Sequence, residues 1–395
     1  MRSPAPVAVT GLGCICAAGR TLPETLAALF RGERAPAPPR RFATSHPTPF
    51  PVFEVAEDFA GRDDLLRTSL LALAAADEAL ADAGWSRESL RPLRVGVCLG
   101  TTVGSAMNNE EFYREYRQGQ DPSLAPIRRF LNSNPAASLA KEYGFDGPCQ
   151  TVVNACSSGS DAVGLAAAWI RAGLCDLALA GGADELCRTT CNGFHALMIA
   201  SDAPVIPFDR RRKGLNLGEG AGVLVLESEA VRGSRSARAF LRGYGAACDA
   251  HHLTAPHPEG AGLQRALIEA LAEAGATAAE IAFVNAHGTG TADNDRVESR
   301  VLAAMLPQVP FLSTKGYTGH TLGAAGGIEA ALTVACLERG EIPASIGFVE
   351  PDPELPATPV TQTTAATGEL AISQSLAFGG NNAVLVFGRG NRGKA

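Results

Sequence analysis

The chain has 395 residues, a formal net charge of −7 and 46% hydrophobic residues. The acidic balance argues against a nucleic-acid-binding protein, because a phosphate backbone demands a basic surface. No uninterrupted apolar run reaches the length of a membrane span. Because the chain exceeds the usual size of one hydrophobic core, we expect a globular protein with two domains or a duplicated fold.

Strands and helices alternate along the first half of the chain. The expected elements are a strand at 6–10, a helix at 70–83, a strand at 93–99, a helix at 138–144, a strand leading to Cys156, an Ala-rich helix at 162–172, and strands at 177–180 and 222–227. The first strand is expected to end in a turn at Gly11-Leu12-Gly13. That turn is not a dinucleotide site, because the third glycine of the fingerprint would fall on Cys16.

The second half repeats this order after a polar segment at 228–236. The expected elements are strands at 237–245, 281–285, 311–313, 370–375 and 383–387, and helices at 262–274, 295–306 and 326–338. Alternating strands and helices predict a layered α/β fold, and the similar rhythm suggests an internal duplication. We place the two domains at 1–230 and 231–395.

Cysteine usage favours the cytoplasm. Most of the ten cysteines stand in apolar stretches as small core side chains, and a chain of this length needs no disulfides. The expected turn at Gly11–Gly13 also fits a signal-peptide cleavage site poorly. Cys187, Cys191 and His195 are four residues apart and could share a helical face, but no fourth ligand stands at a zinc spacing, so we expect no metal.

Three small-residue motifs carry chemically capable side chains. Cys156 follows an apolar strand and precedes a helix, where N–H groups and the helix dipole favour a thiolate. His287 lies in Asn-Ala-His-Gly-Thr-Gly-Thr, and His320 ends Lys-Gly-Tyr-Thr-Gly-His. One nucleophile and two imidazoles on separate turns predict covalent catalysis with an exposed thiol of low pKa.

Read together and in order, these motifs resemble the elongating β-ketoacyl-acyl-carrier-protein synthases of the thiolase superfamily. The similarity also includes Pro-Phe-Asp-Arg at 207–210, Gly-Glu-Gly-Ala-Gly at 218–222 and Phe-Gly-Gly-Asn-Asn at 378–382. It covers nearly the whole chain. The resemblance implies a thiolase-like fold of two duplicated α/β halves with stacked sheets and helical layers, and a decarboxylative Claisen condensation with malonyl–carrier protein.

The resemblance implies a role for each catalytic residue. Cys156 carries the acyl group, and His287 and His320 donate N–H groups to the thioester oxygen of the malonyl unit. Lys315, paired with Glu329, orders the histidine site; a surface ion pair is the alternative reading. Asp295 and Glu298 occupy the family's acidic positions as structural hydrogen-bond partners.

Further positions match the family's substrate contacts. Thr289 and Thr291 are expected to bind the pantetheine arm, and Val103 and Phe194 to line the acyl pocket. Phe378 is the expected gate, with Gly379 and Gly380 allowing its loop to move, and the amides of Cys156 and Phe378 form the expected oxyanion hole. Core packing is the alternative role of Phe378.

The resemblance also implies partners. No cofactor is expected, because the substrates travel on the phosphopantetheine of an acyl carrier protein. The basic residues expected to dock that protein are Arg62, Arg67, Arg128, Arg129, Arg211 and Arg212, and a solvated surface is the alternative. We expect either a homodimer or a heterodimer with a homologue similar to a chain-length factor.

Departures from the family pattern bear on the substrate. Ala377 precedes the gate where many relatives have glycine, and Asn294 replaces a usual glycine. The motif Lys-Gly-Tyr-Thr-Gly-His is similar to the corresponding motif in ketosynthases of aryl-polyene pathways. Acyl length, saturation and aromatic character stay open at this point.

Three rival functions are weighed against this one. A non-catalytic subunit of the chain-length-factor kind usually lacks the nucleophile, which Cys156 supplies here. A coenzyme-A thiolase uses a second catalytic cysteine near its C-terminus, and no cysteine follows Cys336. A scaffold that only docks carrier protein would leave the Lys315–Glu329 pair without a purpose.

Overall fold

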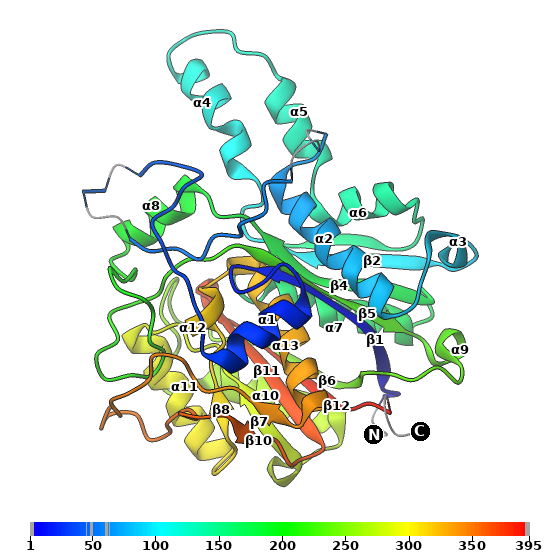
Figure 1. The fold of residues 1–395 in the computed structure, drawn as a ribbon, viewed down its shortest axis with the longest axis vertical. Coiled ribbons are helices and arrows are strands. Elements are labelled where there is room, and N and C mark those ends of the chain that lie inside the picture. Colours follow the sequence, from blue (N-terminus) through cyan, green and yellow to red (C-terminus); the bar gives the residue numbers. More distant parts are fainter. Residues whose placement is uncertain (1–3, 45, 48–49, 60–61, 63, 392–395) are drawn as a thin grey trace.

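The computed structural model describes residues 4–44, 46–47, 50–59, 62 and 64–391 (Figure 1). The first half contains β1 (Val7–Cys16), α1 (Leu22–Arg31), α2 (Arg67–Asp82), α3 (Arg87–Leu90), β2 (Val95–Gly100), α4 (Glu110–Arg117), α5 (Ala125–Asn132), α6 (Pro135–Tyr143), β3 (Cys149–Val152), α7 (Ser158–Arg171), β4 (Leu177–Asp184), α8 (Arg188–Ala196) and β5 (Gly220–Glu227).

The second half contains α9 (Glu229–Arg232), β6 (Ala239–Cys248), α10 (Ala261–Ala274), β7 (Ile281–Asn285), α11 (Ala292–Met305), β8 (Phe311–Leu312), α12 (Lys315–Thr318), α13 (Ala325–Arg339), β9 (Glu341–Ile342), β10 (Thr364–Ala365), β11 (Leu370–Ala377) and β12 (Asn381–Arg389). Among the helices of the described residues, none is long and apolar enough to cross a membrane.

Strand order shows that the fold is duplicated. The sheet runs β3-β2-β4-β5-β1 through the first half and continues as β6-β12-β11-β7-β8 through the second, joined where β1 pairs with β6. Reading the second half backwards gives the same order and the same parallel and antiparallel pairings. The expected duplication is therefore confirmed at the level of topology, although the boundary at residue 230 stays a prediction.

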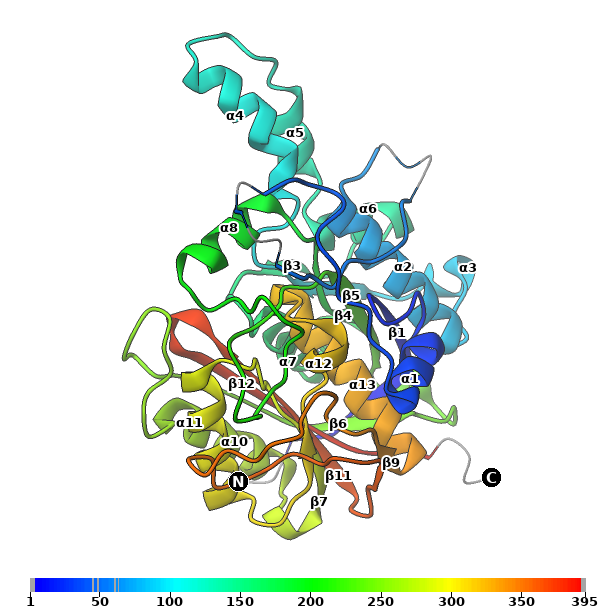
Figure 2. The same ribbon diagram turned by 60° about the vertical axis from the view of Figure 1, so that its left-hand side comes forward.

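The layers follow from which helices each half packs against. Helix α2 covers the outer face of β1, β4 and β5, and α10 covers the outer face of β6 and β12. Helices α7 and α13 contact each other and strands of both halves, so they form the central layer (Figures 1 and 2). Apolar residues of both halves meet there in one buried cluster.

The expected turn at Gly11–Gly13 is wrong, because β1 continues unbroken to Cys16. A Cβ atom on Gly11 would lie 2.0 Å from the Ala79 carbonyl oxygen of α2, and one on Gly13 would lie 1.9 Å from that of Ala75. These glycines therefore allow a helix to pack against the strand backbone. Gly243 and Gly245 do the same between β6 and α10, which is a further mark of the duplication.

The types of the predicted helices and strands were mostly correct, whereas their first and last residues were less accurate. Strand β7 begins and ends where expected, whereas β4 runs on through the glycines at 181–182 to Asp184. Helices α1, α4, α5 and α8 were not expected. Helices α4 and α5 form an arm that projects from the body of the molecule, and neither contains a buried residue (Figures 1 and 2).

A substitution in β1 tests the close packing of helix on strand. Gly11→Ala should destabilise the protein by about 1–3 kcal/mol, because α2 must move to admit the methyl group. The matched control is Gly193→Ala in α8, where nothing lies within 4 Å of the added Cβ. That change should be neutral or stabilising by up to ~1 kcal/mol. Urea denaturation measures both, and equal midpoints for the two variants would contradict the packing argument.

Candidate active site

Cys156 lies on a tight turn between β3 and α7. Ala155 before it has φ +50°, a left-handed conformation that a non-glycine residue adopts only when its surroundings hold it. The Ser158 hydroxyl holds the turn by accepting from the Asn154 amide at 2.7 Å and donating to the Ala155 carbonyl at 2.6 Å. The sulfur thus stands directly before the N-terminus of a 14-residue helix.

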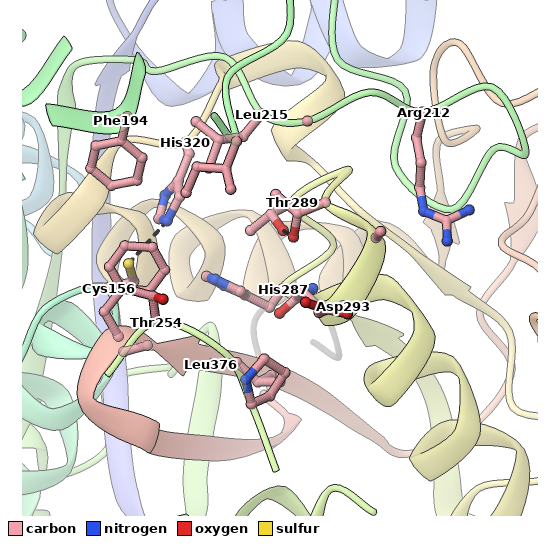
Figure 3. A pocket seen from close by; sticks show the side chains of 18 of the residues that line it. Cys156, Phe194, Arg212, Leu215, Thr254, His287, Thr289, Asp293, His320 and Leu376 are labelled. Carbon is pink, nitrogen blue, oxygen red and sulfur yellow. Dashed lines mark hydrogen bonds between the residues drawn. The ribbon is translucent and has the colours of Figure 1, made fainter. Parts of the chain in front are cut away.

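A cavity of about 260 Å³ leads from Cys156 to the surface. His287 and His320 line it near the sulfur, whereas Arg212 stands at the opposite side of the pocket (Figure 3). Phe378 is a further lining residue. Thr289 and Thr291 line the wall between, and their hydroxyls are 2.9 Å apart. The structure therefore gathers the expected nucleophile, imidazoles, gate and threonines around one space.

His320 directs its Nε2 atom at the nucleophile. Nε2 lies 3.0 Å from the Cys156 sulfur, and Nδ1 accepts a hydrogen bond from the Leu322 amide at 3.3 Å. An amide N–H can only donate, so Nδ1 carries no proton and the neutral ring carries its proton on Nε2. Burial, and secondarily the charge of Lys315, holds the pKa of His320 well below its ordinary value.

His287 has the same arrangement with a different donor. Lys315 Nζ lies 3.0 Å from His287 Nδ1, and an ammonium group is only a donor. The proton of the neutral ring is therefore again on Nε2, on the side that faces the cavity. Burial, then the charge of Lys315, lowers the pKa of His287 far below its ordinary value. The two rings meet edge to face with centroids 5.2 Å apart.

Lys315 and Glu329 form a buried ion pair. Their side chains are 1% and 3% exposed, and Lys315 Nζ donates to Glu329 Oε1. Burial raises the pKa of Glu329 to about 7 against the opposing effect of Lys315. The surface alternative for this pair is wrong, because an ion pair at this depth is screened by protein rather than by water.

Two buried carboxylates fix the loop that carries His287. Glu298 accepts from the backbone amides of His287 at 2.6 Å and Gly288 at 2.7 Å, and from the Gln374 side chain at 2.6 Å. Asp295 accepts from the Gly290 amide at 3.1 Å and the Phe208 amide at 2.7 Å. The expectation that both acids are structural hydrogen-bond partners is confirmed, whereas their backbone partners and the contribution of Gln374 were not expected.

The loop that carries Phe378 is held by contacts with its neighbours. The Phe378 ring stacks on Phe194 at 5.6 Å between centroids, and Gly379 and Gly380 have φ +84° and +79°. The Gly379 amide donates to the Leu253 carbonyl at 2.8 Å. Phe194 therefore lies at the cavity as expected, but Val103 does not: it is half-buried in the loop after β2 and is not among the cavity's lining residues.

The thiol differs from the expectation of an exposed, acidic group. Cys156 is only 5% exposed, and burial raises its pKa to about 11. Lys315 and a hydrogen bond from the Phe378 backbone lower that pKa but do not offset the burial. The prediction from the helix N-terminus was wrong because it counted the favourable dipole and left out desolvation.

Cys156, His287 and His320 are residue types that bind metals, but the proton positions on the imidazoles do not suit metal binding. One sulfur and two imidazole nitrogens of Cys156, His287 and His320 lie within 4.8 Å of one another. A metal needs a lone pair on Nε2, and the Leu322 amide forces the proton of His320 onto that atom. Among the described residues, Cys187, Cys191 and His195 do not come together as a ligand set.

The expected docking arginines fall into two groups. The docking role expected for Arg67 is wrong. Its side chain is 8% exposed and binds the buried Glu219, which links α2 to the residue that precedes β5. The side chain of Arg212 is likewise only 7% exposed and lies beside Asp352 and Asp295. The remaining four are exposed or partly exposed, namely Arg62, Arg128, Arg129 and Arg211.

Several lining residues were not expected. Leu215, Leu376 and Ile199 give the cavity an apolar wall, and Thr254 and Asp293 are polar lining residues, Thr254 lying on the Cys156 side of the pocket (Figure 3). Leu376 directly precedes the Ala377-Phe378 gate, so its place next to that motif was a usable signal. Asp293 lies in the first turn of α11, and Leu215, Ile199 and Thr254 come from loops whose course the sequence does not determine.

A nucleophilic thiol at a helix N-terminus, facing two neutral imidazole donors inside a duplicated α/β fold, defines a condensing enzyme of the acyltransferase type. Residues 5–231 match the family described as "Beta-ketoacyl synthase, N-terminal domain", and residues 238–349 match "Beta-ketoacyl synthase, C-terminal domain". The chain belongs to the β-ketoacyl synthase family, and its fold is the thiolase-like fold of that family.

Relatives and solved structures agree over the full length. The "3-oxoacyl-[acyl-carrier-protein] synthase 2" of Synechocystis sp. is 33% identical and covers 96% of this chain and 97% of its own. "The ishigamide ketosynthase/chain length factor" is 34% identical with a TM-score of 0.90, over 98% and 99%. A "type II PKS acyl-carrier protein in complex with its ketosynthase" is 28% identical with a TM-score of 0.88, over 98% and 99%.

Alkylation measures the state of the resting thiol. With a pKa of about 11, the Cys156 thiolate fraction should rise about tenfold per pH unit between pH 7 and pH 10, and the rate of iodoacetamide modification should rise with it. Peptide mass spectrometry separates Cys156 from the exposed Cys149 and Cys248. A rate that levels off below pH 8 would show that the thiol is acidic in the folded protein.

Proposed function

We propose that Cys156 accepts an acyl group from acyl–carrier protein in the first half-reaction. The sulfur attacks the thioester carbonyl, the bond to the pantetheine sulfur breaks, and the proton of the Cys156 thiol ends on the departing pantetheine thiol. The backbone amides of Cys156 and Phe378 are the proposed oxyanion hole. The hydrogen bond from the Phe378 backbone to the sulfur supports this, because it places that amide at the reacting atom.

In the second half-reaction, malonyl–carrier protein loses carbon dioxide and its thioester becomes an enolate. We assign the stabilisation of the enolate oxygen to the Nε2–H groups of His287 and His320. The enolate carbon then attacks the acyl group, the bond to Cys156 breaks, and the β-ketoacyl product stays on the carrier protein. The single observation that carries this proposal is the pair of donors to Nδ1, which leaves both Nε2 protons facing one cavity.

The remaining site residues take supporting roles. We infer that Lys315 and Glu329 hold His287 neutral and in this tautomer, and that Thr289 and Thr291 bind the pantetheine arm along the cavity wall. No cofactor enters the scheme, since the thioester activates the carbonyl and loss of carbon dioxide generates the carbanion. Phe378 and Phe194 are the proposed gate between the sulfur and the acyl pocket.

The partners are proposed from surface features. The exposed Arg128 and Arg211 are assigned to carrier-protein docking. The arm of α4 and α5 exposes Tyr113, Tyr116 and Leu131, and β3 is a sheet edge beside the exposed Val153, so these apolar surfaces support assembly with a second copy or a homologue.

Ten free cysteines support a reducing compartment, the cytoplasm. The aryl-polyene substrate stays a prediction.

Single substitutions separate the two half-reactions. Cys156→Ala should abolish acyl loading because it removes the nucleophile. His287→Ala or His320→Ala should leave loading measurable and lower malonyl decarboxylation about 10²–10³-fold, because each removes one donor to the enolate oxygen. Intact mass spectrometry measures loading, and carbon dioxide release measures decarboxylation. Acylation of a residue other than Cys156 would refute the assignment.

Charge reversal tests the docking surface. Arg128→Glu and Arg211→Glu should each weaken carrier-protein binding about fivefold at low salt, which corresponds to ~1 kcal/mol, and the effect should shrink as salt increases. Arg91→Glu is the control, since Arg91 is exposed at the end of α3. Calorimetric titration with carrier protein measures the affinities. An affinity unchanged from that of the control removes either arginine from the interface.

A further inference from the structure

One buried carboxylate bonds to both ends of the turn that presents Cys156. Asp161 stands in the first turn of α7 and is 9% exposed. Its Oδ2 atom accepts from the Asn154 side-chain amide at 2.6 Å and from the Ser157 hydroxyl at 2.8 Å. The two residues between these donors are strained Ala155 and Cys156 itself. The carboxylate therefore links the two ends of the turn that carries the nucleophile.

The other oxygen of Asp161 is bound from the second half of the fold. Tyr244 on β6 donates its hydroxyl to Asp161 Oδ1 at 2.8 Å. Its ring lies against Gly164 of α7, where a Cβ atom would come within 2.5 Å of the ring. The tyrosine thus fits a space that only glycine leaves, and it binds the carboxylate oxygen that the turn does not use.

The histidines are held by other groups. His320 is fixed by the Leu322 amide, and His287 by Lys315 and by Glu298 through its backbone. None of these groups bonds to Asp161. A change at Asp161 or Tyr244 should therefore move the sulfur and leave the two Nε2 donors in place.

We propose that Asp161, held by Tyr244, is a positioning residue for Cys156. By bonding both ends of the strained turn, it keeps the sulfur in the cavity and within reach of His320 Nε2. It governs the loading step and not decarboxylation. This inference rests on the proposed loading of acyl groups onto Cys156.

The test compares loading with decarboxylation in matched variants. Asp161→Ala removes all three hydrogen bonds and should slow acyl loading about 10–100-fold, the loss expected when a reacting atom is displaced by a fraction of an ångström to an ångström. Tyr244→Phe removes one bond, keeps the ring and should slow loading less. Both should decarboxylate malonyl–carrier protein within about twofold of the parent rate. Asp161→Asn keeps one acceptor oxygen and should fall between Asp161→Ala and the parent.

Tyr143→Phe is the matched control. Tyr143 donates to Asp77 at 2.7 Å in the same kind of tyrosine–carboxylate pair, but between α6 and α2. It should change neither rate. If Asp161→Ala does not fold, the comparison of Tyr244→Phe with Tyr143→Phe decides alone.

Two results would overturn the positioning role. Equal loading by Tyr244→Phe, Asp161→Ala and the parent would show that the turn needs no carboxylate. A parallel fall of loading and decarboxylation would show a general structural role. In either case the parent still acylates Cys156, and the proposed function stands. A parent that does not acylate Cys156 overturns both.

Discussion

The chemistry of this site depends on the direction of two hydrogen bonds at the Nδ1 atoms of His287 and His320. Lys315 and the Leu322 amide are donors that cannot accept a proton in return. Both rings are buried, which keeps them neutral, so each has one proton and that proton lies on Nε2. The protein thereby converts two groups that could act as bases or metal ligands into a pair of fixed donors. Fixed donors stabilise a developing negative charge without reorganising when it appears.

Burial of the nucleophile affects when the Cys156 thiol becomes reactive. A thiol with a raised pKa is protonated while it rests, which protects it from oxidation and alkylation because both require the thiolate. Two groups favour the thiolate: Lys315 through its charge and the Phe378 backbone through a hydrogen bond. The negative charge of the thiolate is therefore stabilised only inside the cavity that holds the sulfur.

The duplicated fold explains why these groups meet. Helices α7 and α13 lie back to back between the two halves, and the nucleophile precedes one helix while Glu329 belongs to the other. The close approach of these helices needs small residues. A Cβ on Gly159 would lie 2.6 Å from the Gly327 amide, and one on Gly326 would lie 2.3 Å from the Ser160 hydroxyl. The glycines near Cys156 and at the start of α13 are thus required for the packing of the central layer.

The sequence predicted the parts of the site that are coded locally and missed those set by tertiary contacts. Cys156 and His287 follow strands and His320 follows the short helix α12, each at a turn of small residues, so their motifs were readable. Arg67 was misread because a basic side chain looks the same whether it meets solvent or buried Glu219. The pKa of Cys156 was misread for the same reason: the helix end is visible in the sequence, but the loss of water around the sulfur is not. Desolvation is a property of the closed cavity, and only the folded chain determines it.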